Sequence, residues 1–557
     1  MTFAKKSAFY ILVSLLLLLV YPLDLYFPTG NQCIYFFWGI KDTGFGFLSN
    51  DFLATQPDPF PLFSLIVTYS SQLCGNSVFL FWYWLINFIY VIAIFEIAEE
   101  AYGKLDYKLN RILFTVLFLF ANSTLVWGFF FTQFFNFDLR WAWDSGFAEQ
   151  GILRGYFQPS CFGVFILLSF MFFIKASSQP SPKAKRKSYL FAFVSAALAA
   201  CFHANYLLVS GVFILVYILF LAREKNYKTA ITGGVISFLI VLPYLIYILK
   251  NFGSVSPETI EYINNHIKGH IHFDYHVWLN KETFLQLSLI LFSLWLMRKT
   301  VLFFPLLAAL FILMVLTLLT YLSGSIFLLN LTPWRISVVL IPVALAIVLS
   351  FLSSGENKTL YRLNFSFIIA IILSALYFRI FGNNSSEYML KWRIFTVLAF
   401  VAITLLIFIS EKYFPPDFFN KIISAKTIIL LLCLGLSGIL LHKKHRESEV
   451  GLMVFVRKNL SEKQQYLIPP EMTDFRLTTG VPVFVDSTNY HSNALPEWDK
   501  RLTIVNQLYR EENLILLDSL VKNCGITHIV TGNEMGFPMN KKIYGIGRYA
   551  IFELNER

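Results

Sequence analysis

The sequence predicts a polytopic α-helical membrane protein that ends in a small C-terminal α/β soluble domain. Of its 557 residues, 57% are hydrophobic and 14% are charged, whereas about a quarter of the residues in soluble domains are charged. Apolar runs of about 18 residues or more recur through most of the chain, and about 20 helical residues cross a bilayer. After residue 446 these runs stop, and short strand-like and helix-like patterns replace them.

The apolar runs predict about thirteen membrane-spanning helices. The first run lacks a small-residue cleavage site, so we interpret it as a retained helix and not as a signal peptide. The fifth and sixth segments nearly touch, which requires HANY (203–206) to form a tight turn. The predicted spans are 8–27, 78–97, 111–130, 158–175, 188–204, 206–222, 229–249, 284–298, 301–323, 336–352, 363–381, 394–410 and 424–442.

The distribution of Lys and Arg among the loops predicts the orientation. Loops on the same side as the N-terminus, including PKAKRK (182–187), carry more basic residues than the opposite loops. Because cytoplasmic loops are enriched in Lys and Arg, we place the N-terminus in the cytoplasm of a multi-pass cell-membrane (inner or plasma membrane) protein. The outer segments are then 28–77, 131–157, 250–283, 324–335 and 382–393.

Two domains follow, a transmembrane domain at 1–446 and a soluble domain at 447–557. In the second, GVPVFVD (480–486) and GITHIVTG (525–532) resemble short buried strands, and 506–525 has helical spacing. An odd number of spans puts this domain outside the cell. The basic stretch LHKKHRE (441–447) is the opposing signal, because it favours the cytoplasm.

Charge and motifs exclude several function classes. The formal net charge is +11, but the basic residues are scattered among loops, which favours contact with anionic lipid or lipid phosphate over nucleic acid. The six cysteines form no CxxC pair. The sequence contains no P-loop and no GxGxxG fingerprint, so we expect no nucleotide at the site.

Polar residues concentrate in the predicted outer segments. This group combines cationic donors that suit a phosphate, aromatic faces that suit a sugar ring, and carboxylates that can accept a proton. Asp58, between two prolines, is expected to form a turn. The residues that we expect to contact substrate are Asn31, Gln32, Gln158, His203, Asp274, Lys391 and Arg393.

The outer segment EYINNHIKGHIHFDYHVW (261–278) holds four of the nine histidines. Zinc sites use histidine, but no cysteine lies nearby and no HExxH motif is present. We therefore prefer contacts with a lipid phosphate, since histidine and lysine donate hydrogen bonds to its oxygens. No metal site and no cofactor are expected, and a divalent cation is the less favoured alternative.

At these residues the chain resembles the GT-C integral-membrane glycosyltransferases, which include protein O-mannosyltransferases and lipid A aminoarabinose transferases. The matching element is LSNDF (48–52), which follows NQ (31–32). A bacterial subgroup is more similar. Its pattern resembles RGYFQPS (154–160), FHANYLL (202–208), HIHFDYHVW (270–278), LTPWR (331–335) and the tail at 466–501.

The resemblance implies a GT-C-like fold and an inverting transfer of a sugar, hexosyl or pentosyl, from a polyprenyl-phosphate donor to a hydroxyl acceptor at the extracytoplasmic face. It implies Asp51 as the catalytic carboxylate, and it implies that Arg335, His270, His272 and Arg154 hold the donor phosphate. The acceptor would be a glycan, a lipid or a protein of the cell envelope. Two alternatives stay open: a lipid-linked glycan polymerase or ligase, and a lipid or sugar transporter or flippase.

Overall fold

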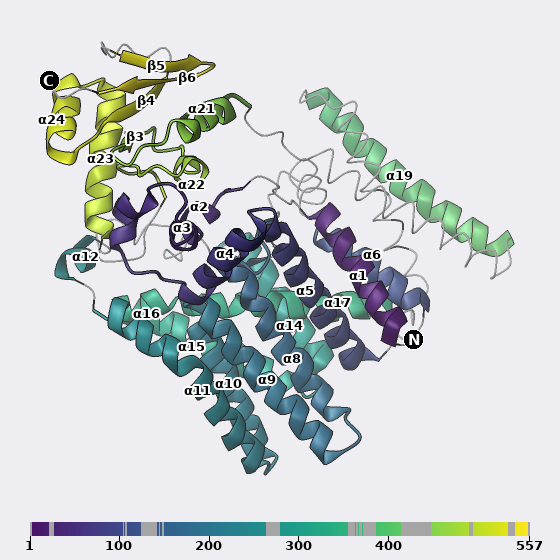
Figure 1. Ribbon diagram of the computed structural model, residues 1–557. Helices are drawn as coiled ribbons and strands as arrows, with labels where there is room; N and C mark the ends of the chain where they lie inside the picture. The colour runs from purple at the N-terminus through teal and green to yellow at the C-terminus, as the bar shows by residue number, and fades with distance from the viewer. Residues whose placement is uncertain are drawn as a thin grey trace.

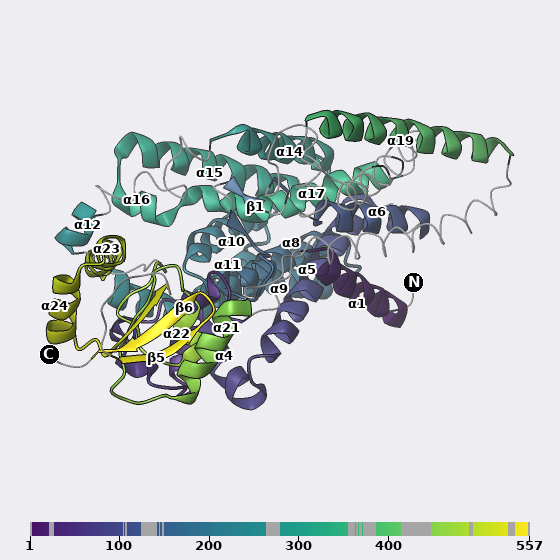
Figure 2. The ribbon, with the colours of Figure 1, turned by 90° about the horizontal axis from the view of Figure 1, so that it is seen from above.

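The computed structural model has a helical bundle with a small mixed α/β domain on one end (Figure 1). In Figure 1 the C-terminal domain lies over α2 and α3, which separate it from the bundle. The N-terminal helix and α19 lie at the opposite side of the bundle in both Figure 1 and Figure 2. The structure describes residues 3–21, 27–103, 105, 108–123, 142–143, 145–147, 150–254, 256–262, 279–354, 363, 366, 370, 386–413, 447–488, 494–532 and 541–554.

Long apolar helices make up the bundle, and several short helices lie between and beside them. The long helices are α1 (Phe3–Val20), α4 (Pro61–Cys74), α5 (Val78–Tyr102), α6 (Lys108–Ala121), α8 (Val164–Ser177), α9 (Pro182–Phe202), α10 (Asn205–Arg223), α11 (Tyr227–Phe252), α14 (Lys281–Met297), α15 (Phe303–Ser323), α17 (Ser337–Ser353) and α19 (Ser386–Tyr413). The short ones are α2 (Gln32–Tyr35), α3 (Phe37–Lys41), α12 (Pro257–Tyr262), α16 (Ile326–Leu331) and the 3-10 helices η1 (Leu48–Asn50), η2 (Phe52–Thr55), η4 (Pro159–Gly163) and η6 (Pro333–Ile336). The short strands β1 (Ser145–Gly146) and β2 (Gln150–Gly151) pair in an antiparallel arrangement.

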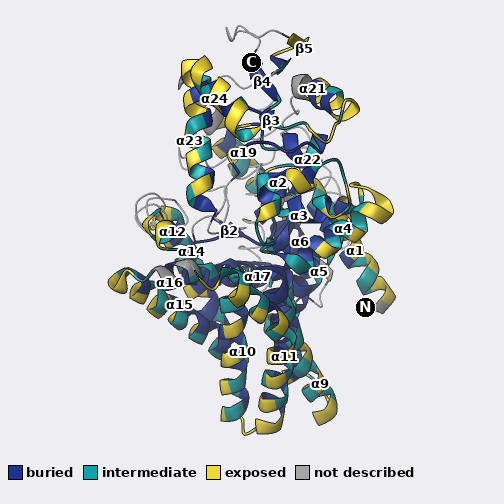
Figure 3. Ribbon diagram, turned by 60° about the vertical axis from the view of Figure 1, so that its left-hand side comes forward, coloured by how far each residue is buried: buried dark blue, intermediate teal, exposed yellow. Residues whose placement is uncertain are grey.

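Burial separates the centre of the bundle from its lipid-facing surface (Figure 3). Helix α17 is apolar on all sides and nearly all of its side chains are buried, as expected for a central helix. By contrast α11 and α15 expose large apolar side chains such as Phe238 and Phe311, which are 57% and 68% exposed. Apolar surface on this scale fits helices that face lipid hydrocarbon.

Among the described residues, six helices are long and apolar enough to cross a membrane, and the predicted number of about thirteen is not confirmed. The six overlap the predicted spans at 78–97, 158–175, 206–222, 229–249, 301–323 and 336–352. The predicted turn at 203–206 is confirmed, because α9 ends at Phe202, His203 is extended and α10 begins at Asn205. The predicted span 424–442 lies outside the described residues, and most of the span 363–381 does too.

The C-terminal domain is built on a four-stranded sheet of order β3-β4-β6-β5. Strand β3 (Tyr466–Leu467) runs parallel to β4 (His528–Gly532), and β4, β6 (Tyr549–Glu553) and β5 (Lys541–Ile546) are antiparallel. Helices α21 (Glu447–Lys458), α22 (Phe475–Thr479), α23 (Leu495–Glu511) and α24 (Leu514–Cys524) complete the domain. The expected strand at 525–532 is present as β4, whereas 480–486 contributes a single bridge between Val483 and Tyr466.

The helical spacing at 506–525 corresponds to two helices, the end of α23 and the whole of α24. Helix α23 ends at Glu511, and Glu512 adopts a left-handed conformation with φ of +49°. The side chain of Asn513 then caps α24 by accepting a hydrogen bond from the Leu516 N–H. A left-handed residue followed by an N-cap ends one helix and starts the next, although the apolar spacing continues through both.

The C-terminal domain packs on the segments that the sequence analysis places outside. Leu477, Phe484 and Val485 belong to the same buried apolar cluster as Phe37 and Leu53 of the first outer segment. Tyr262 of α12 interacts with the Asp499 carboxylate of α23, and burial together with this carboxylate raises the pKa of Tyr262 to about 12. The domain therefore lies on the same side of the bundle as residues 28–77 and α12.

Candidate functional site

The NQ and RGYFQPS motifs form one structural unit. Nδ2 of Asn31 donates a hydrogen bond to Oε1 of Gln158 over 3.5 Å, and the Asn31 N–H donates to the Tyr156 hydroxyl over 3.3 Å. Nε2 of Gln32 donates to the Phe157 carbonyl over 3.0 Å. The structure thus brings together three predicted substrate residues, Asn31, Gln32 and Gln158, from segments about 125 positions apart.

Gly30 makes this contact possible. Its φ of +49° lies in the left-handed region, and a Cβ at this position would lie 2.8 Å from the Tyr156 hydroxyl oxygen. Only glycine combines this conformation with so close an approach. The sequence TGNQ therefore forms a tight turn that packs α2 against residues 156–158.

His203 lies beside this unit, between α9 and α10. Its Nδ1 accepts a hydrogen bond from the Asn205 N–H over 3.2 Å. A neutral imidazole that accepts at Nδ1 carries its proton on Nε2, so Nε2 is a hydrogen-bond donor. The ring is 7% exposed and packs against Phe60, Tyr35 and Tyr206, with ring centroids 5.0, 6.4 and 5.5 Å away.

Arg335 enters the same neighbourhood from the start of α17. The preceding loop is sharply bent, because Thr332 has a φ of +43° and Pro333 begins the 3-10 helix η6. In the described part of the chain, the Nε of Arg335 is buried and has no hydrogen-bond partner. Its positive charge interacts with the side chains of Tyr35 and Tyr206.

Arg154 supplies a second positive charge to the same tyrosines. Burial raises the pKa of Tyr35 and of Tyr156, and in both cases the nearby charge of Arg154 opposes the shift. Tyr206 also lies within the electrostatic influence of both Arg154 and Arg335. We call Tyr35, Arg154, His203, Tyr206 and Arg335 the Arg335 cluster.

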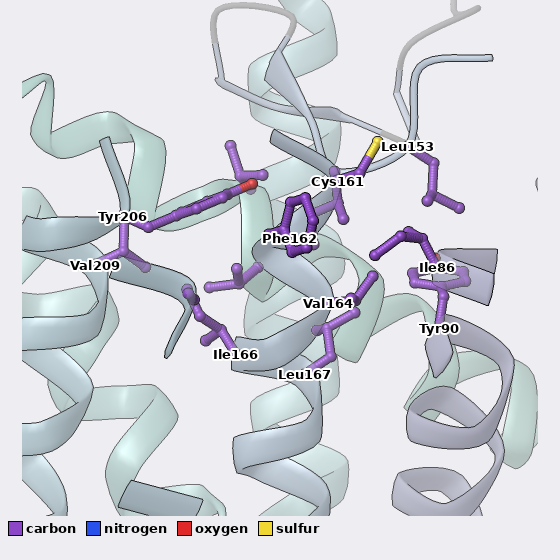
Figure 4. Packing of buried hydrophobic residues seen from close by; sticks show 14 of the residues in the cluster. Ile86, Tyr90, Leu153, Cys161, Phe162, Val164, Ile166, Leu167, Tyr206 and Val209 are labelled. Atoms are coloured by element: carbon purple, nitrogen blue, oxygen red, sulfur yellow. The ribbon is translucent and has the colours of Figure 1, made fainter. Parts of the chain in front are cut away.

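An apolar layer supports the Arg335 cluster from the bundle side. The Tyr206 hydroxyl donates to the Ser160 carbonyl over 2.6 Å, which fixes the ring above the start of α8. Figure 4 shows Tyr206 pointing toward Phe162 and Cys161. The apolar side chains drawn around them include Ile86, Leu153, Val164, Ile166 and Leu167. Guanidinium groups at the edge of such a layer interact strongly with an anion, because little water screens them.

Asp51 lies in a different environment, in contact with the C-terminal domain. Its Oδ2 accepts hydrogen bonds from Arg476 Nε over 2.8 Å and from the Val483 N–H over 2.9 Å. Its Oδ1 accepts from the Leu53 N–H over 2.9 Å and so caps η2. NH1 of Arg476 lies 3.1 Å from Oδ2 of Asp486. We call Asp51, Arg476 and Asp486 the Arg476 cluster.

The Arg476 cluster is closed to solvent. The side chains of Asp51 and Asp486 are 0% exposed and that of Arg476 is 1% exposed. A base must receive a proton from its substrate at hydrogen-bond distance, and both oxygens of Asp51 are already occupied by protein donors. The role of Asp51 as catalytic base therefore stays a prediction, and its contacts assign it a role in attaching the C-terminal domain.

Asp58 is more accessible than Asp51, and Asp42, the third carboxylate of the first outer segment, is exposed beside Lys41. The expected turn at Asp58 is confirmed, since its Oδ1 accepts a hydrogen bond from the Phe60 N–H over 2.8 Å. The residue is only partly buried, and burial raises its pKa above the ordinary value. Phe60, two residues on, contacts both His203 and Tyr35. Asp58 is thus connected to the Arg335 cluster through one aromatic side chain.

Several predicted residues cannot be assigned to either cluster. His270, His272 and Asp274 lie outside the described residues. Lys391 and Arg393 belong to helix α19, but their side chains lie outside the described part. Within the described residues, no group of three or more His, Cys, Asp or Glu is placed to hold a metal ion.

The structure adds residues that sequence reasoning missed. Tyr35 follows Gln32 by three positions, a spacing that puts both on one face of a helix, and this was an available signal. Arg476 and Asp486 had no such signal, because Arg476 meets Asp51 across 425 positions of sequence. Long-range ion pairs of this kind leave no local pattern.

The chain matches no protein-family model and no curated protein. Among solved structures it is similar to ArnT from Cupriavidus metallidurans in the apo state, over 99% of this chain and 98% of that one, with a TM-score of 0.53 and 14% sequence identity. The chain has the GT-C fold. It is also similar to the same ArnT bound to undecaprenyl phosphate, with a TM-score of 0.46, 11% identity and coverage of 99% and 98%.

A further solved structure is an oligosaccharyltransferase from Archaeoglobus fulgidus in the apo form. It has a TM-score of 0.45 and 12% identity, over 96% of this chain and 70% of that one. The similarity to ArnT in the apo state extends over 99% of this chain, with its helical bundle and its small C-terminal domain. The expected fold class is therefore confirmed.

Proposed function

We propose that this protein is an inverting glycosyltransferase that moves a sugar from a polyprenyl-phosphate donor to a hydroxyl acceptor. The observation that carries the proposal is the Arg335 cluster. The Nε of Arg335 is buried without a hydrogen-bond partner among the described residues, which is costly, and a bound anion would remove that cost. The GT-C fold supports glycosyl transfer, and ArnT has been solved with undecaprenyl phosphate.

The donor phosphate would contact the Arg335 and Arg154 guanidiniums, with His203 donating from Nε2. Planar guanidinium groups bind phosphate oxygens through two parallel hydrogen bonds. His270 and His272 are the further phosphate ligands that the resemblance implies. The amides of Asn31, Gln32 and Gln158 would orient the sugar, together with Asp274, Lys391 and Arg393.

In the reaction, the acceptor hydroxyl oxygen attacks the anomeric carbon while the bond from that carbon to the phosphate oxygen breaks. The hydroxyl proton passes to a carboxylate, and prenyl phosphate leaves with the bonding electrons. The arginines stabilise the charge that develops on the leaving oxygen. No nucleotide or metal cofactor enters this scheme.

A carboxylate of the first outer segment would take the proton. Asp51 is the base that the resemblance implies, and Asp58 is the alternative that the geometry adds. Partial exposure and a raised pKa suit Asp58 to proton transfer, since a base works best when its pKa approaches the ambient pH. Asp51 would first have to give up a hydrogen bond from Arg476 or Val483.

We place the protein in the cell membrane, with the Arg335 cluster and the C-terminal domain on the extracytoplasmic side. The acceptor would be a glycan, lipid or protein of the cell envelope. The experiment is transfer by the purified protein in lipid nanodiscs, supplied with undecaprenyl-phosphate hexoses and pentoses and with cell-envelope extract. Donor turnover that Arg335→Gln abolishes is the expected result. Turnover of none of these donors, together with no binding of undecaprenyl phosphate, would refute the proposal.

A further inference from the structure

We infer that Arg476 of the C-terminal domain is a positioning residue for the donor site, because it holds helix α2 against the Arg335 cluster. The inference rests on the proposed function, since α2 carries two residues of the proposed site, Gln32 and Tyr35. The soluble domain is then a structural part of the site, although Arg476 itself touches no substrate.

Arg476 contacts the first outer segment in two places. Its guanidinium donates through Nε to Asp51, which lies beyond α3 in the chain. The guanidinium carbon also lies 5.6 Å from the centre of the Phe37 ring, at the start of α3, in a cation–π arrangement. One buried side chain thus fixes both ends of the segment that follows α2.

Helix α2 itself presents one side to the C-terminal domain. Cys33 is 1% exposed and interacts through its thiol with Thr473, close to the charges of Asp474, Asp486 and Arg476. Burial is the main cause that raises the pKa of this thiol to about 12. Cys33 is therefore covered by residues of the soluble domain.

The other side of α2 belongs to the proposed site. Gln32 donates to the Phe157 carbonyl, and the Tyr35 ring lies 5.0 Å from Phe60 and 6.4 Å from His203. Because α2 spans only Gln32–Tyr35, it has little rigidity of its own and depends on what packs around it. A displacement on the Cys33 side must therefore move Tyr35 relative to Arg335.

The chemistry of Arg476 suits a positioning role better than a stabilising one. Buried ion pairs contribute little net stability because desolvation offsets their attraction, but their directional hydrogen bonds select one arrangement. Removal of Arg476 would leave two carboxylates, Asp51 and Asp486, buried without their shared cation. The docked arrangement would then rearrange to expose them.

The test measures the binding of undecaprenyl phosphate to the full-length protein in nanodiscs, alongside peptide-resolved alkylation of Cys33. We expect Arg476→Gln to weaken binding by about three- to tenfold, the range for residues that act through a packed network. We also expect Cys33 to become reactive in this variant. Arg476→Lys keeps the charge but not the planar guanidinium group, so we expect its affinity to lie between those of Arg476→Gln and the wild type.

Arg457→Gln is the matched control. Arg457 also joins the C-terminal domain to the first outer segment, with its guanidinium carbon 5.2 Å from the Phe45 ring, but it is exposed and contacts neither Asp51 nor α3 in the described structure. We expect unchanged affinity and a protected Cys33 in this variant. Should Arg476→Gln fail to fold, Arg476→Lys serves for the same two measurements.

Unchanged affinity in both Arg476 variants would overturn the inference, whether or not Cys33 becomes reactive. Failure of the proposed function gives a different result. In that case the wild-type protein shows no Arg335-dependent binding of undecaprenyl phosphate, and Cys33 still reports whether Arg476 holds α2.

Discussion

The side of the bundle that carries the C-terminal domain contains two arginine groups in opposite situations. Arg476 lies between two carboxylates and is closed to solvent. Arg335 lies among tyrosines, and its buried Nε has no hydrogen-bond partner within the described residues. A guanidinium with carboxylate partners is already neutralised by the protein, whereas one without them is prepared for an anionic ligand. Both are arginines near the same short helix, so only their partners separate a structural role from a binding role.

The largest expected effect concerns two carboxylates, Asp58 beside the Arg335 cluster and Asp51 in the Arg476 cluster. We expect Asp58→Asn to slow sugar transfer by about 10²- to 10⁴-fold, the usual contribution of a general base, with donor affinity unchanged. We expect Asp51→Asn to act instead through the Arg476 cluster, by weakening the docking of the C-terminal domain. Transfer rates and Cys33 alkylation in the two variants measure both effects.

The same measurements can identify Asp51 as the base instead. Near-normal transfer by Asp58→Asn, combined with loss of transfer by a fully docked Asp51→Asn variant, would rule out Asp58 and favour Asp51 as the base. It would also show that a carboxylate of the Arg476 cluster takes part in the chemistry and has more than a structural role.

The second effect concerns Arg335 alone. We expect Arg335→Gln to weaken the binding of undecaprenyl phosphate by about 2–5 kcal/mol, the cost of truncating one partner of a buried charge pair. The affinity of Arg335→Lys should lie between those of the wild type and Arg335→Gln, because Lys keeps the charge but loses the bidentate geometry. Calorimetric or fluorescence titration in nanodiscs measures this. Wild-type affinity in the Gln variant would mean that another cation holds the phosphate.

The third effect concerns the docking of the C-terminal domain. Gly46 has a φ of +62°, and a Cβ there would lie 2.2 Å from the Gly480 carbonyl oxygen, where the two domains touch. We expect Gly46→Ala to destabilise the docked domain by about 1–3 kcal/mol. Gly44→Ala is the control, since Gly44 also has a positive φ but a Cβ there would meet nothing within 4 Å.

Limited proteolysis of the C-terminal domain compares the docking of the Gly46→Ala and Gly44→Ala variants. Equal sensitivity of the two alanine variants would mean that backbone strain, and not the contact with Gly480, determines the effect.

The smallest effect is a pH dependence of docking. Burial raises the pKa of Asp486, although Arg476 and Thr488 oppose the shift. A raised carboxyl pKa means that the docked state holds the proton more tightly, so its contribution to stability is present at low pH and is lost as the pH rises through the raised value. We expect Asp486→Asn to remove this dependence and to favour docking by on the order of 1 kcal/mol at neutral pH. Thermal unfolding as a function of pH tests it, and a steeper profile in the variant would contradict it.

Sequence reasoning reached the fold class because hydropathy and charge are local signals. The same reasoning placed Arg335, Arg154 and His203 on the outer face, and the structure puts them around two shared tyrosines. It could not find Arg476, because nothing near residue 476 indicates a partner at residue 51. The helical spacing at 506–525 did not indicate that two helices meet there, since apolar spacing carries no record of a left-handed residue such as Glu512.

The most direct test of the account is a structure of the full-length protein with undecaprenyl phosphate. We expect phosphate oxygens at about 3 Å from the Arg335 guanidinium, with Arg154 or His203 as a second donor and with the Asp51–Arg476 ion pair intact. A phosphate bound elsewhere while Arg335 stays without an anion, or one bound to Arg476 after displacement of Asp51, would contradict it.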